Sequence, residues 1–323
     1  LMLAQNAVAK LIDVSVVILS IGLYTSGRME LFNCVMMCSC SFLLTEGVEQ
    51  AGTQSSLLRV VNTCVDQAES ILKLPAMDIT GEEIAPTNYD IQAKNISFSY
   101  DKKQIIGDIT LEIPQKTVTA VVGPSGGGKT TLCHLLSRFW DVDAGQVTLG
   151  GHDVREYSMD SLMKNFSFVF QSVYLFQDTI ANNIRLWDTS IEDYEVILAA
   201  RDAGIHEVIM QRDGGYNAVL SEGGRDLSGG QRQRLEIARV LAQDPTVLIM
   251  DEATSALDAK TEQEVMSAVR KRGITCIVVA HRLSTVRDCD EIVVLDKGRV
   301  VERGTHEELC ERGGMYLQLV TQE

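Results

Sequence analysis

The chain has 323 residues, of which 45% are hydrophobic and 23% charged, and this ordinary globular composition excludes disordered and collagen-like classes. Its length predicts roughly two domains. The 29 basic and 44 acidic side chains give a net charge of −15, so we expect no nucleic acid among its partners, because such binding relies on neutralising phosphates with cationic side chains.

Two apolar runs open the chain, residues 14–24 and 31–44, with a short polar turn between them. Each run is shorter than the roughly 20 residues that cross a bilayer, and either alone could be a buried core helix. Their pairing and the small, weakly polar residues within them favour helices that pack on other membrane-spanning helices. Extending the first run would include Lys10 and Asp13, whose charges are costly in a bilayer unless they face other helices or water.

A long amphipathic stretch and a linker follow these runs. Apolar residues recur at helical spacing over residues 45–74, which predicts a helix that continues from the second run. Pro75 ends this pattern, and the polar residues 76–90 predict a linker. The expected organisation is a first domain over residues 1–74, a linker over 75–88 and a second domain over 89–323.

Beyond residue 90 the pattern changes to strands and then to strands alternating with helices. Alternating residues predict half-buried strands, and short continuous apolar runs predict buried parallel strands. The expected strands cover residues 91–100, 105–113, 118–123, 166–170, 246–250, 275–280 and 291–296. The last strand should turn through residues 296–298 into a hairpin with RVVERG. The expected helices cover residues 129–138, 158–165, a long stretch over 190–212, 230–243 and 259–271.

Residues 123–130 read GPSGGGKT, a match to G-x-x-x-x-G-K-[ST] that lies between a predicted strand and a predicted helix. The glycines allow backbone N–H groups to surround phosphate oxygens, and the helix N-terminus adds positive partial charge. We expect Lys129 to contact the β- and γ-phosphates of a nucleotide and the Thr130 hydroxyl to hold Mg²⁺. The expected phosphate-binding residues are Gly123, Pro124, Ser125, Gly126, Gly127, Gly128, Lys129, Thr130 and Thr131.

Residues 247–252 read VLIMDE, an apolar strand that ends in two carboxylates. Asp251 suits Mg²⁺, and Glu252 lies where it could polarise a water molecule against the γ-phosphate. The pattern alone is weak, because many buried strands end in Asp-Glu. Together with the phosphate loop, however, it supplies the phosphate cradle, the metal ligand and the base that hydrolysis requires.

Residues 227–231 read LSGGQ, and their glycines open another helix whose N-terminus is a second anion site. One nucleotide does not need two such sites. The combination resembles the ATP-binding cassette of ABC transporters over residues 91–323, and LSGGQ with the overlapping QRQR of residues 231–234 is the signature sequence of that family. The resemblance implies an α/β P-loop NTPase cassette, with a mixed sheet core and a helical subdomain, preceded by all-α transmembrane helices.

The resemblance also implies roles for single residues. Tyr100 matches the aromatic residue that stacks on adenine, Gln171 the glutamine that senses Mg²⁺ and links to the membrane domain, and His281 the histidine that contacts the γ-phosphate. Alone, each of the three would be an ordinary residue, and their order around the stronger motifs favours the functional interpretation. The implied catalytic residues are Lys129, Gln171, Glu252 and His281, and the implied Mg²⁺ ligands are Thr130, Gln171 and Asp251.

The same resemblance implies a partner. Two cassettes of this family dimerise head to tail, so that the phosphate loop of one and residues Ser228, Gly229, Gly230 and Gln231 of the other enclose one ATP, and residues 255–258 (SALD) contact the partner subunit. The partner is either a second copy or a related subunit. Because the γ-phosphate bridges both cassettes, ATP should favour the closed dimer and hydrolysis should release it.

Exporters of the family place six membrane helices before the cassette. By this resemblance residues 4–24 would be the fifth helix, 25–30 the outer loop and 31–52 the sixth helix, which continues as 53–74. We therefore expect a C-terminal fragment of a multi-pass protein of the cytoplasmic membrane, with the cassette on the cytoplasmic side. Such a fragment could bind and hydrolyse ATP but would not form a translocation path.

The sequence does not decide which substrate is exported. Residues 220–241 and 272–309 resemble bacterial exporters of bacteriocin-type peptides, whereas residues 178–184 are generic for exporters. A peptide is therefore one expected substrate, and a lipid, a drug or a siderophore-type small molecule are the alternatives. A soluble non-transport ABC ATPase and an importer cassette are rival classes, and the fused apolar segments argue against both.

Overall fold

The computed structural model describes residues 2–74, 77–101, 103–170, 172–254, 256–280, 282 and 286–321. The chain forms two compact units, Leu1–Ala76 and Met77–Glu323. The sequence predicts a boundary near residue 88, but the structure places residues 77–88 in the second unit.

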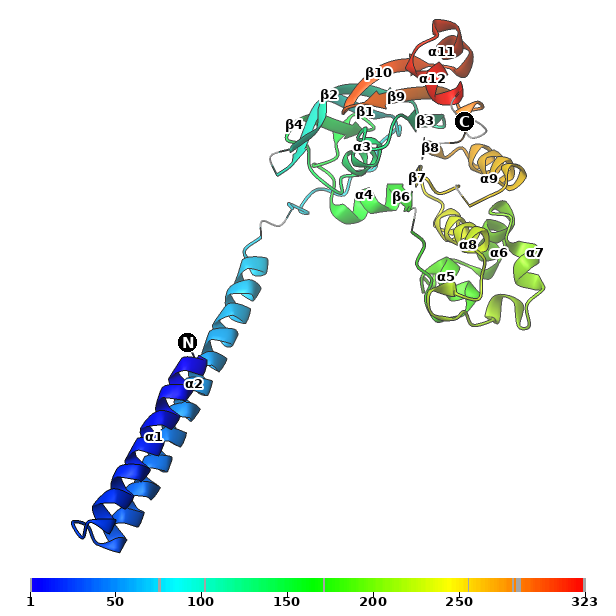
Figure 1. Ribbon diagram of the computed structural model, residues 1–323. Coiled ribbons are helices and arrows are strands. Elements are labelled where there is room, and N and C mark those ends of the chain that lie inside the picture. The colour runs from blue at the N-terminus through cyan, green and yellow to red at the C-terminus, as the bar shows by residue number, and fades with distance from the viewer. Residues whose placement is uncertain are drawn as a thin grey trace. The chain divides into compact units, whose positions relative to one another are not determined.

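The first unit is a hairpin of two helices, α1 (Met2–Thr25) and α2 (Leu31–Leu72), shown in blue in Figure 1. Both are long and apolar enough to cross a membrane, with candidate spans at Ala7–Thr25 and Leu31–Leu72. Most of their large apolar side chains are exposed, so the two helices are not the buried core of a soluble domain. The helix expected over residues 53–74 continues from the second apolar run as a single helix, α2. No proline interrupts α2 before Pro75.

Asp13 is buried between the two helices. Its Oδ1 atom accepts hydrogen bonds from the Ser41 hydroxyl at 2.5 Å and the Thr45 hydroxyl at 2.8 Å, both on α2. Lys10, by contrast, is exposed on α1. The charge of Asp13, which the sequence marks as costly, therefore faces the neighbouring helix and polar donors.

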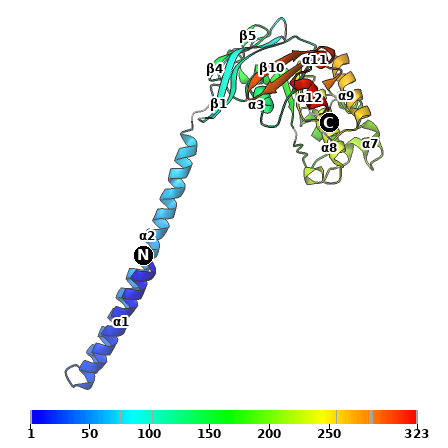
Figure 2. The same ribbon diagram turned by 45° about the horizontal axis from the view of Figure 1, so that its top comes forward.

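The second unit contains two sheets (Figure 2). A four-stranded antiparallel sheet has the order β2-β1-β4-β5, with bounds β1 (Ile91–Tyr100), β2 (Lys103–Ile113), β4 (Ala144–Leu149) and β5 (His152–Asp153). A six-stranded sheet has the order β10-β9-β3-β8-β7-β6, with bounds β3 (Val118–Val122), β6 (Phe166–Val169), β7 (Val247–Asp251), β8 (Thr275–Val279), β9 (Glu291–Asp296) and β10 (Arg299–Gly304). Its strands are parallel except β10, which forms the expected hairpin with β9.

Helices surround these sheets. Their bounds are α3 (Lys129–Leu136), α4 (Met159–Asn165), α5 (Ile180–Arg185), α6 (Asp193–Asp202), α7 (His206–Met210), α8 (Gly229–Ala242), α9 (Ala259–Arg272), α11 (His306–Arg312) and α12 (Met315–Thr321), with 3₁₀ turns at Gly215–Asn217 and Glu222–Gly224. The mixed α/β architecture confirms the expected fold class.

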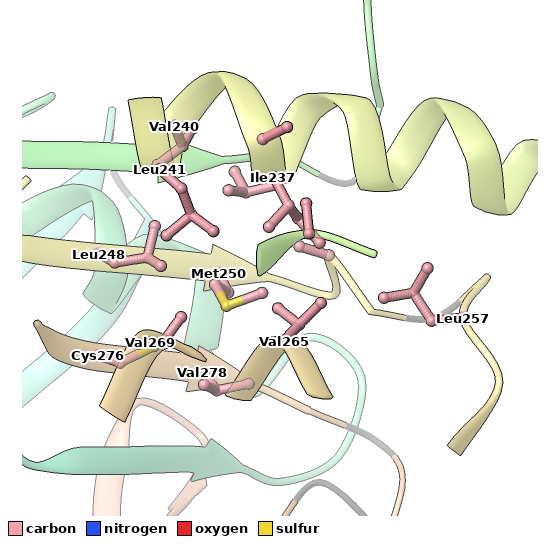
Figure 3. Packing of buried hydrophobic residues seen from close by; sticks show 14 of the residues in the cluster. Ile237, Val240, Leu241, Leu248, Met250, Leu257, Val265, Val269, Cys276 and Val278 are labelled. Atoms are coloured by element: carbon pink, nitrogen blue, oxygen red, sulfur yellow. The ribbon is translucent and has the colours of Figure 1, made fainter. Parts of the chain in front are cut away.

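Two hydrophobic layers hold the cassette together. In the first, the helices α8 and α9 pack on β7 and β8, with Ile237, Met250 and Val269 among the buried contacts (Figure 3). In the second, α3 lies in a core that both sheets share, through residues such as Leu132. Because β3, β7 and β8 are buried on both faces, their sequences are mostly apolar.

The expected long helix over residues 190–212 is divided. Helix α6 ends at Asp202, and Gly204 adopts a left-handed φ of +66° before α7 begins at His206. Glycine is the residue that adopts this conformation without strain, so it ends the helix. The strands β4 and β5 and the helices α5, α11 and α12 were not among the expected elements.

The residues of the expected linker are joined to the cassette by backbone hydrogen bonds. The Glu82 N–H donates to the Glu156 carbonyl at 2.8 Å, and the Ser158 N–H donates to the Glu82 carbonyl at 2.8 Å. Nearby, the Arg138 guanidinium donates to the Asp78 carbonyl at 2.5 Å. A chain segment fixed in this way is part of the fold.

This attachment can be tested at Gly81. A Cβ atom there would lie 2.3 Å from the Tyr157 carbonyl oxygen and 2.6 Å from the Ser158 nitrogen, so Gly81→Ala should force residues 78–84 off the cassette. We expect a loss of about 2 kcal/mol in unfolding free energy and a melting temperature lower by about 4–8 °C.

Thermal unfolding followed by tryptophan fluorescence measures this loss, because both tryptophans of the chain lie in the cassette. Glu83→Ala is the matched control, since the Glu83 side chain is 85% exposed. A Gly81→Ala chain as stable as the control would contradict the attachment.

Candidate functional site

The loop between β3 and α3 is shaped by its glycines. A Cβ atom at Gly123, whose φ is +148°, would lie 2.0 Å from the Leu295 carbonyl oxygen. Gly128 has a φ of +101° and forms the N-cap of α3. Close approach at one end and a left-handed turn at the other fold the loop tightly over the helix N-terminus, where N–H groups can surround an anion.

Lys129 begins α3 and is buried with its amine inside the loop. Its Nζ atom donates to the carbonyls of Gly123 at 2.9 Å and Pro124 at 3.1 Å. Burial lowers the pKa of Lys129, and the carboxylates of Glu252 and Asp251 oppose that shift. The side chain of Lys129 therefore lies among the loop, Asp251 and Glu252.

Asp251 ends β7 beside the same loop. Burial raises its pKa, and a hydrogen bond from the Thr130 side chain acts in the opposite direction. Its Oδ1 atom is buried and has no hydrogen-bond partner among the described residues. A buried carboxylate oxygen without a partner is costly, and together with the Thr130 hydroxyl it forms a set of oxygen ligands that suits Mg²⁺.

Glu252 adopts a left-handed φ of +53°, although it is not a glycine. Its N–H donates to the Val279 carbonyl on β8 at 3.1 Å. Backbone strain of this kind is concentrated at functional sites, where the surrounding structure enforces it. The turn redirects the chain at the end of the sheet, next to Lys129 and Asp251.

Gln233 fixes this turn, a role that the signature sequence around it does not by itself indicate. Its side chain is buried, donates to the Glu252 carbonyl at 3.5 Å and accepts from the Ala256 N–H at 3.0 Å. Gln233 is the second glutamine of the QRQR sequence on α8. It therefore joins the signature helix to the loop that carries Glu252, a link between distant segments.

The signature residues form the N-terminus of α8. Ser228 is the N-cap, and it exchanges hydrogen bonds with Gln231 in a capping box, at 3.3 Å and 2.9 Å. Ser228 and Gly229 are exposed. A Cβ atom at Gly230 would lie 2.8 Å from the Ala256 carbonyl oxygen, so only glycine fits there. The exposed helix end presents free N–H groups to an anion.

Asp226 holds the loop that leads into this helix. It accepts hydrogen bonds from the Ser221 hydroxyl at 2.6 Å and the Ser221 N–H at 3.1 Å, and it pairs with the Arg212 guanidinium. Partial burial raises the pKa of Asp226, but these hydrogen bonds outweigh it and lower the pKa to about 2. The ionised carboxylate therefore stabilises the loop.

The low pKa predicts a pH-dependent effect of Asp226→Asn. An unfolded aspartate titrates near about 3.9, so the ionised side chain stabilises the native state above that pH and loses this effect as the pH falls towards about 2. We expect Asp226→Asn to lower the unfolding free energy at pH 6 by about 1 kcal/mol.

Urea unfolding at several pH values measures this effect, and the deficit should narrow below about pH 4. Asp213→Asn is the matched control, an exposed acid in the same region. A deficit that stays constant down to pH 3 would contradict the role of the charge.

Tyr100 ends β1, and its ring remains 37% exposed. The buried ring of Phe98 meets it edge to face, with centroids 4.9 Å apart. An exposed aromatic ring held at a strand end can stack on a planar base. Its position on β1 is as the sequence predicts.

The expected site residues form one group at the phosphate loop and a second at the signature sequence, and a few lie outside the described residues. Lys129, Thr130, Asp251 and Glu252 lie together around the loop after β3. The signature residues lie on α8, which packs in the first hydrophobic layer, whereas α3 packs in the second. Gln171, His281 and Ser255 lie outside the described residues.

The cassette is similar to proteins of a known family. Residues 106–255 match the model of the ABC transporter family. The chain is 42% identical over 278 residues to the ATP-dependent lipid A-core flippase of Syntrophus aciditrophicus, covering 85% of this chain and 44% of the relative. It is 46% identical over 259 residues to the mitochondrial potassium channel ATP-binding subunit of Mus musculus, and the match covers 77% of this chain and 36% of the relative.

A solved structure extends the likeness to the whole chain. The structure of a bacterial Atm1-family ABC exporter with ATP bound has a TM-score of 0.74 and 32% identity, covering 98% of this chain and 57% of that one. The chain thus spans less than half the length of the two curated relatives. None of these three proteins is named as a peptide exporter, so the expected resemblance to bacteriocin exporters has no support from them.

Proposed function

Because the chain carries the ATPase cassette of an exporter-type ABC transporter, we propose that it binds ATP between two cassettes and couples ATP hydrolysis to export across a membrane. The observation that carries this proposal is the placement of its two anion-binding helix ends. Helix α3 and helix α8 start in different layers of one cassette, so each cassette offers two separate half-sites.

The two half-sites support a head-to-tail dimer. The phosphate loop and Lys129 of one cassette hold the triphosphate, and the exposed N-terminus of α8 in the partner closes over the γ-phosphate. The partner is a second copy or a related subunit. Because the γ-phosphate then contacts both cassettes, ATP stabilises the closed dimer, and its loss on hydrolysis opens the dimer.

Each residue of the site has a proposed role. The Lys129 amine exchanges its hydrogen bonds to the loop carbonyls for the β- and γ-phosphate oxygens, which are stronger acceptors because they are charged. Thr130, Asp251 and Gln171 would hold Mg²⁺, which when bound neutralises phosphate charge. Glu252 accepts a proton from the attacking water, and His281 hydrogen-bonds the γ-phosphate.

The proposed route to the membrane domain begins at a cavity of about 330 Å³. Its lining includes the aromatic rings of Phe139, Phe168 and Phe170, together with the polar side chains of Glu236 and Arg239. The rings of Phe168 and Phe170 stack with centroids 4.4 Å apart. A groove of this kind suits a cytoplasmic loop or helix of the membrane domain, which would follow movements of the nucleotide site.

The helices α1 and α2 are proposed as the last two spans of a multi-pass membrane domain, with the cassette on the cytoplasmic side, where ATP is available. The similarity to a lipid A-core flippase favours a lipid over a peptide as substrate. The exposed apolar side chains of both helices are consistent with this placement, because further helices and lipid would cover them.

The proposal is tested by ATP hydrolysis measured against protein concentration. A rate that rises faster than linearly shows that two identical cassettes form the working site. ATP binding without hydrolysis at any concentration would favour a different partner cassette. No ATP binding at all would contradict the proposal.

Glu252→Gln should separate binding from hydrolysis. The amide cannot accept the proton, so we expect ATP hydrolysis to fall by at least about 100-fold while ATP remains bound. Retained radiolabelled ATP and released phosphate measure the two steps, with Glu264→Gln on the exposed face of α9 as control. Undiminished phosphate release would refute the role of Glu252 as base.

Lys129→Ala should strongly weaken nucleotide binding. The side chain supplies a charge-assisted contact to two phosphates, so we expect ATP affinity to fall by about tenfold or more. Equilibrium binding measures this, with the exposed Lys116→Ala as the matched control. Equal affinities of the two variants would exclude Lys129 from the phosphate site.

A further inference from the structure

Trp140 is an exposed aromatic residue that no motif covers. It follows α3 in the chain and is 49% exposed. Its ring meets the ring of Tyr100 edge to face, with centroids 5.5 Å apart and an interplanar angle of 88°. A half-exposed indole therefore lies directly beside the expected base-stacking ring.

Tyr100 is held by aromatic edges from two directions. Phe98 lies 4.9 Å away at 87°, and Trp140 lies 5.5 Å away at 88°. Phe98 is buried and anchors the group to the core. Perpendicular aromatic pairs of this kind are attractive, so together they restrict the Tyr100 ring to one orientation while part of it stays open.

The segment that carries Trp140 is fixed on both sides. Before it, the Arg138 guanidinium donates to the carbonyls of Val154 at 3.1 Å and Tyr157 at 3.2 Å. After it, the Asp143 N–H donates to the Ser97 carbonyl at 2.9 Å, and the Asp143 carboxylate accepts from the Ser99 N–H at 2.8 Å. Trp140 is thus held next to the end of β1 by hydrogen bonds that do not involve Tyr100.

Helix α3 therefore joins two parts of one ligand site. Its first residue is Lys129, at the phosphate loop, and the segment that follows its last turn carries Trp140, at the base-stacking ring. One helix of eight residues fixes the distance between the two parts.

We propose that Trp140 is a positioning residue for the nucleotide base. It holds the Tyr100 ring in the orientation on which adenine stacks, and it thereby favours nucleotides with a planar base over bare polyphosphate. This inference rests on the proposed ATP site. Trp140 itself acts through Tyr100, and the phosphate loop does not depend on it.

The test compares ATP with inorganic tripolyphosphate, which has the phosphates without the base. Trp140→Ala should weaken ATP binding about two- to tenfold, the range for one lost aromatic pair, and should leave tripolyphosphate binding unchanged. Trp140→Phe should restore most of the ATP affinity, because a smaller ring can still meet Tyr100. Trp187→Ala is the matched control, since Trp187 is 48% exposed and contacts Phe176 instead.

Fluorescence gives a second measurement that a merely structural role would not change. In a Trp187→Phe chain Trp140 is the single tryptophan, since the sequence contains two. Its emission should change when ATP binds and stay constant when tripolyphosphate binds.

The outcomes separate this inference from the proposed function. If Trp140→Ala weakens both ligands equally, or weakens neither, the inference is overturned while ATP binding by the unchanged chain still supports the proposed function. If the unchanged chain binds neither ligand, the proposed function fails and the inference fails with it.

Discussion

The buried guanidinium of Arg138 is the interaction on which the cassette depends. Arg138 is 2% exposed, and it donates to the carbonyls of Asp78, Val154 and Tyr157 and to the Asp141 carboxylate. A guanidinium stays charged in proteins, so it can be buried only where its donors are satisfied. These partners fix the far end of α3, the segment before Trp140 and the chain that arrives from the first unit. The phosphate loop at the other end of α3 is positioned relative to this anchor.

The charged side chains of the candidate site are buried, and keeping them charged without a bound ligand costs free energy. Burial disfavours the charged form of both Lys129 and Asp251, and the Lys129 amine makes its hydrogen bonds to carbonyls of its own loop. A nucleotide and its metal ion would supply the missing counter-charges. Binding of such a ligand to the native state alone stabilises it, so the site links occupancy to the stability of the cassette.

The sequence predicts the parts of this structure that depend on local pattern. The strands β3, β7 and β8 are mostly apolar because both faces are buried, and the phosphate loop is contiguous in the chain. The helices α5, α11 and α12 have six or seven residues each, too few to show a helical period. Strand β4 begins with Ala144 and Gly145, which give no alternating signal.

Contacts between segments far apart in the sequence could not be predicted from local sequence patterns. The bond from Arg138 to Asp78 shows that the expected linker belongs to the cassette. The bond from Gln233 to the Glu252 carbonyl and the contact of Trp140 with Tyr100 likewise join residues that are far apart in sequence. The motifs therefore predict the reacting groups, while the residues that hold those groups in place become visible in the fold. The roles of all the expected site residues, Gln171 and His281 among them, stay predictions.

The hydrogen bonds of Asp13 have a consequence for how the two apolar helices enter a bilayer. Helix α1 alone would bring a carboxylate into hydrocarbon, and its insertion as a single helix is therefore unfavourable. Ser41 and Thr45, which satisfy that carboxylate, lie on α2 and are synthesised later. For the membrane placement proposed above, entry of the two helices into the bilayer as one hairpin is therefore more favourable than entry of α1 alone.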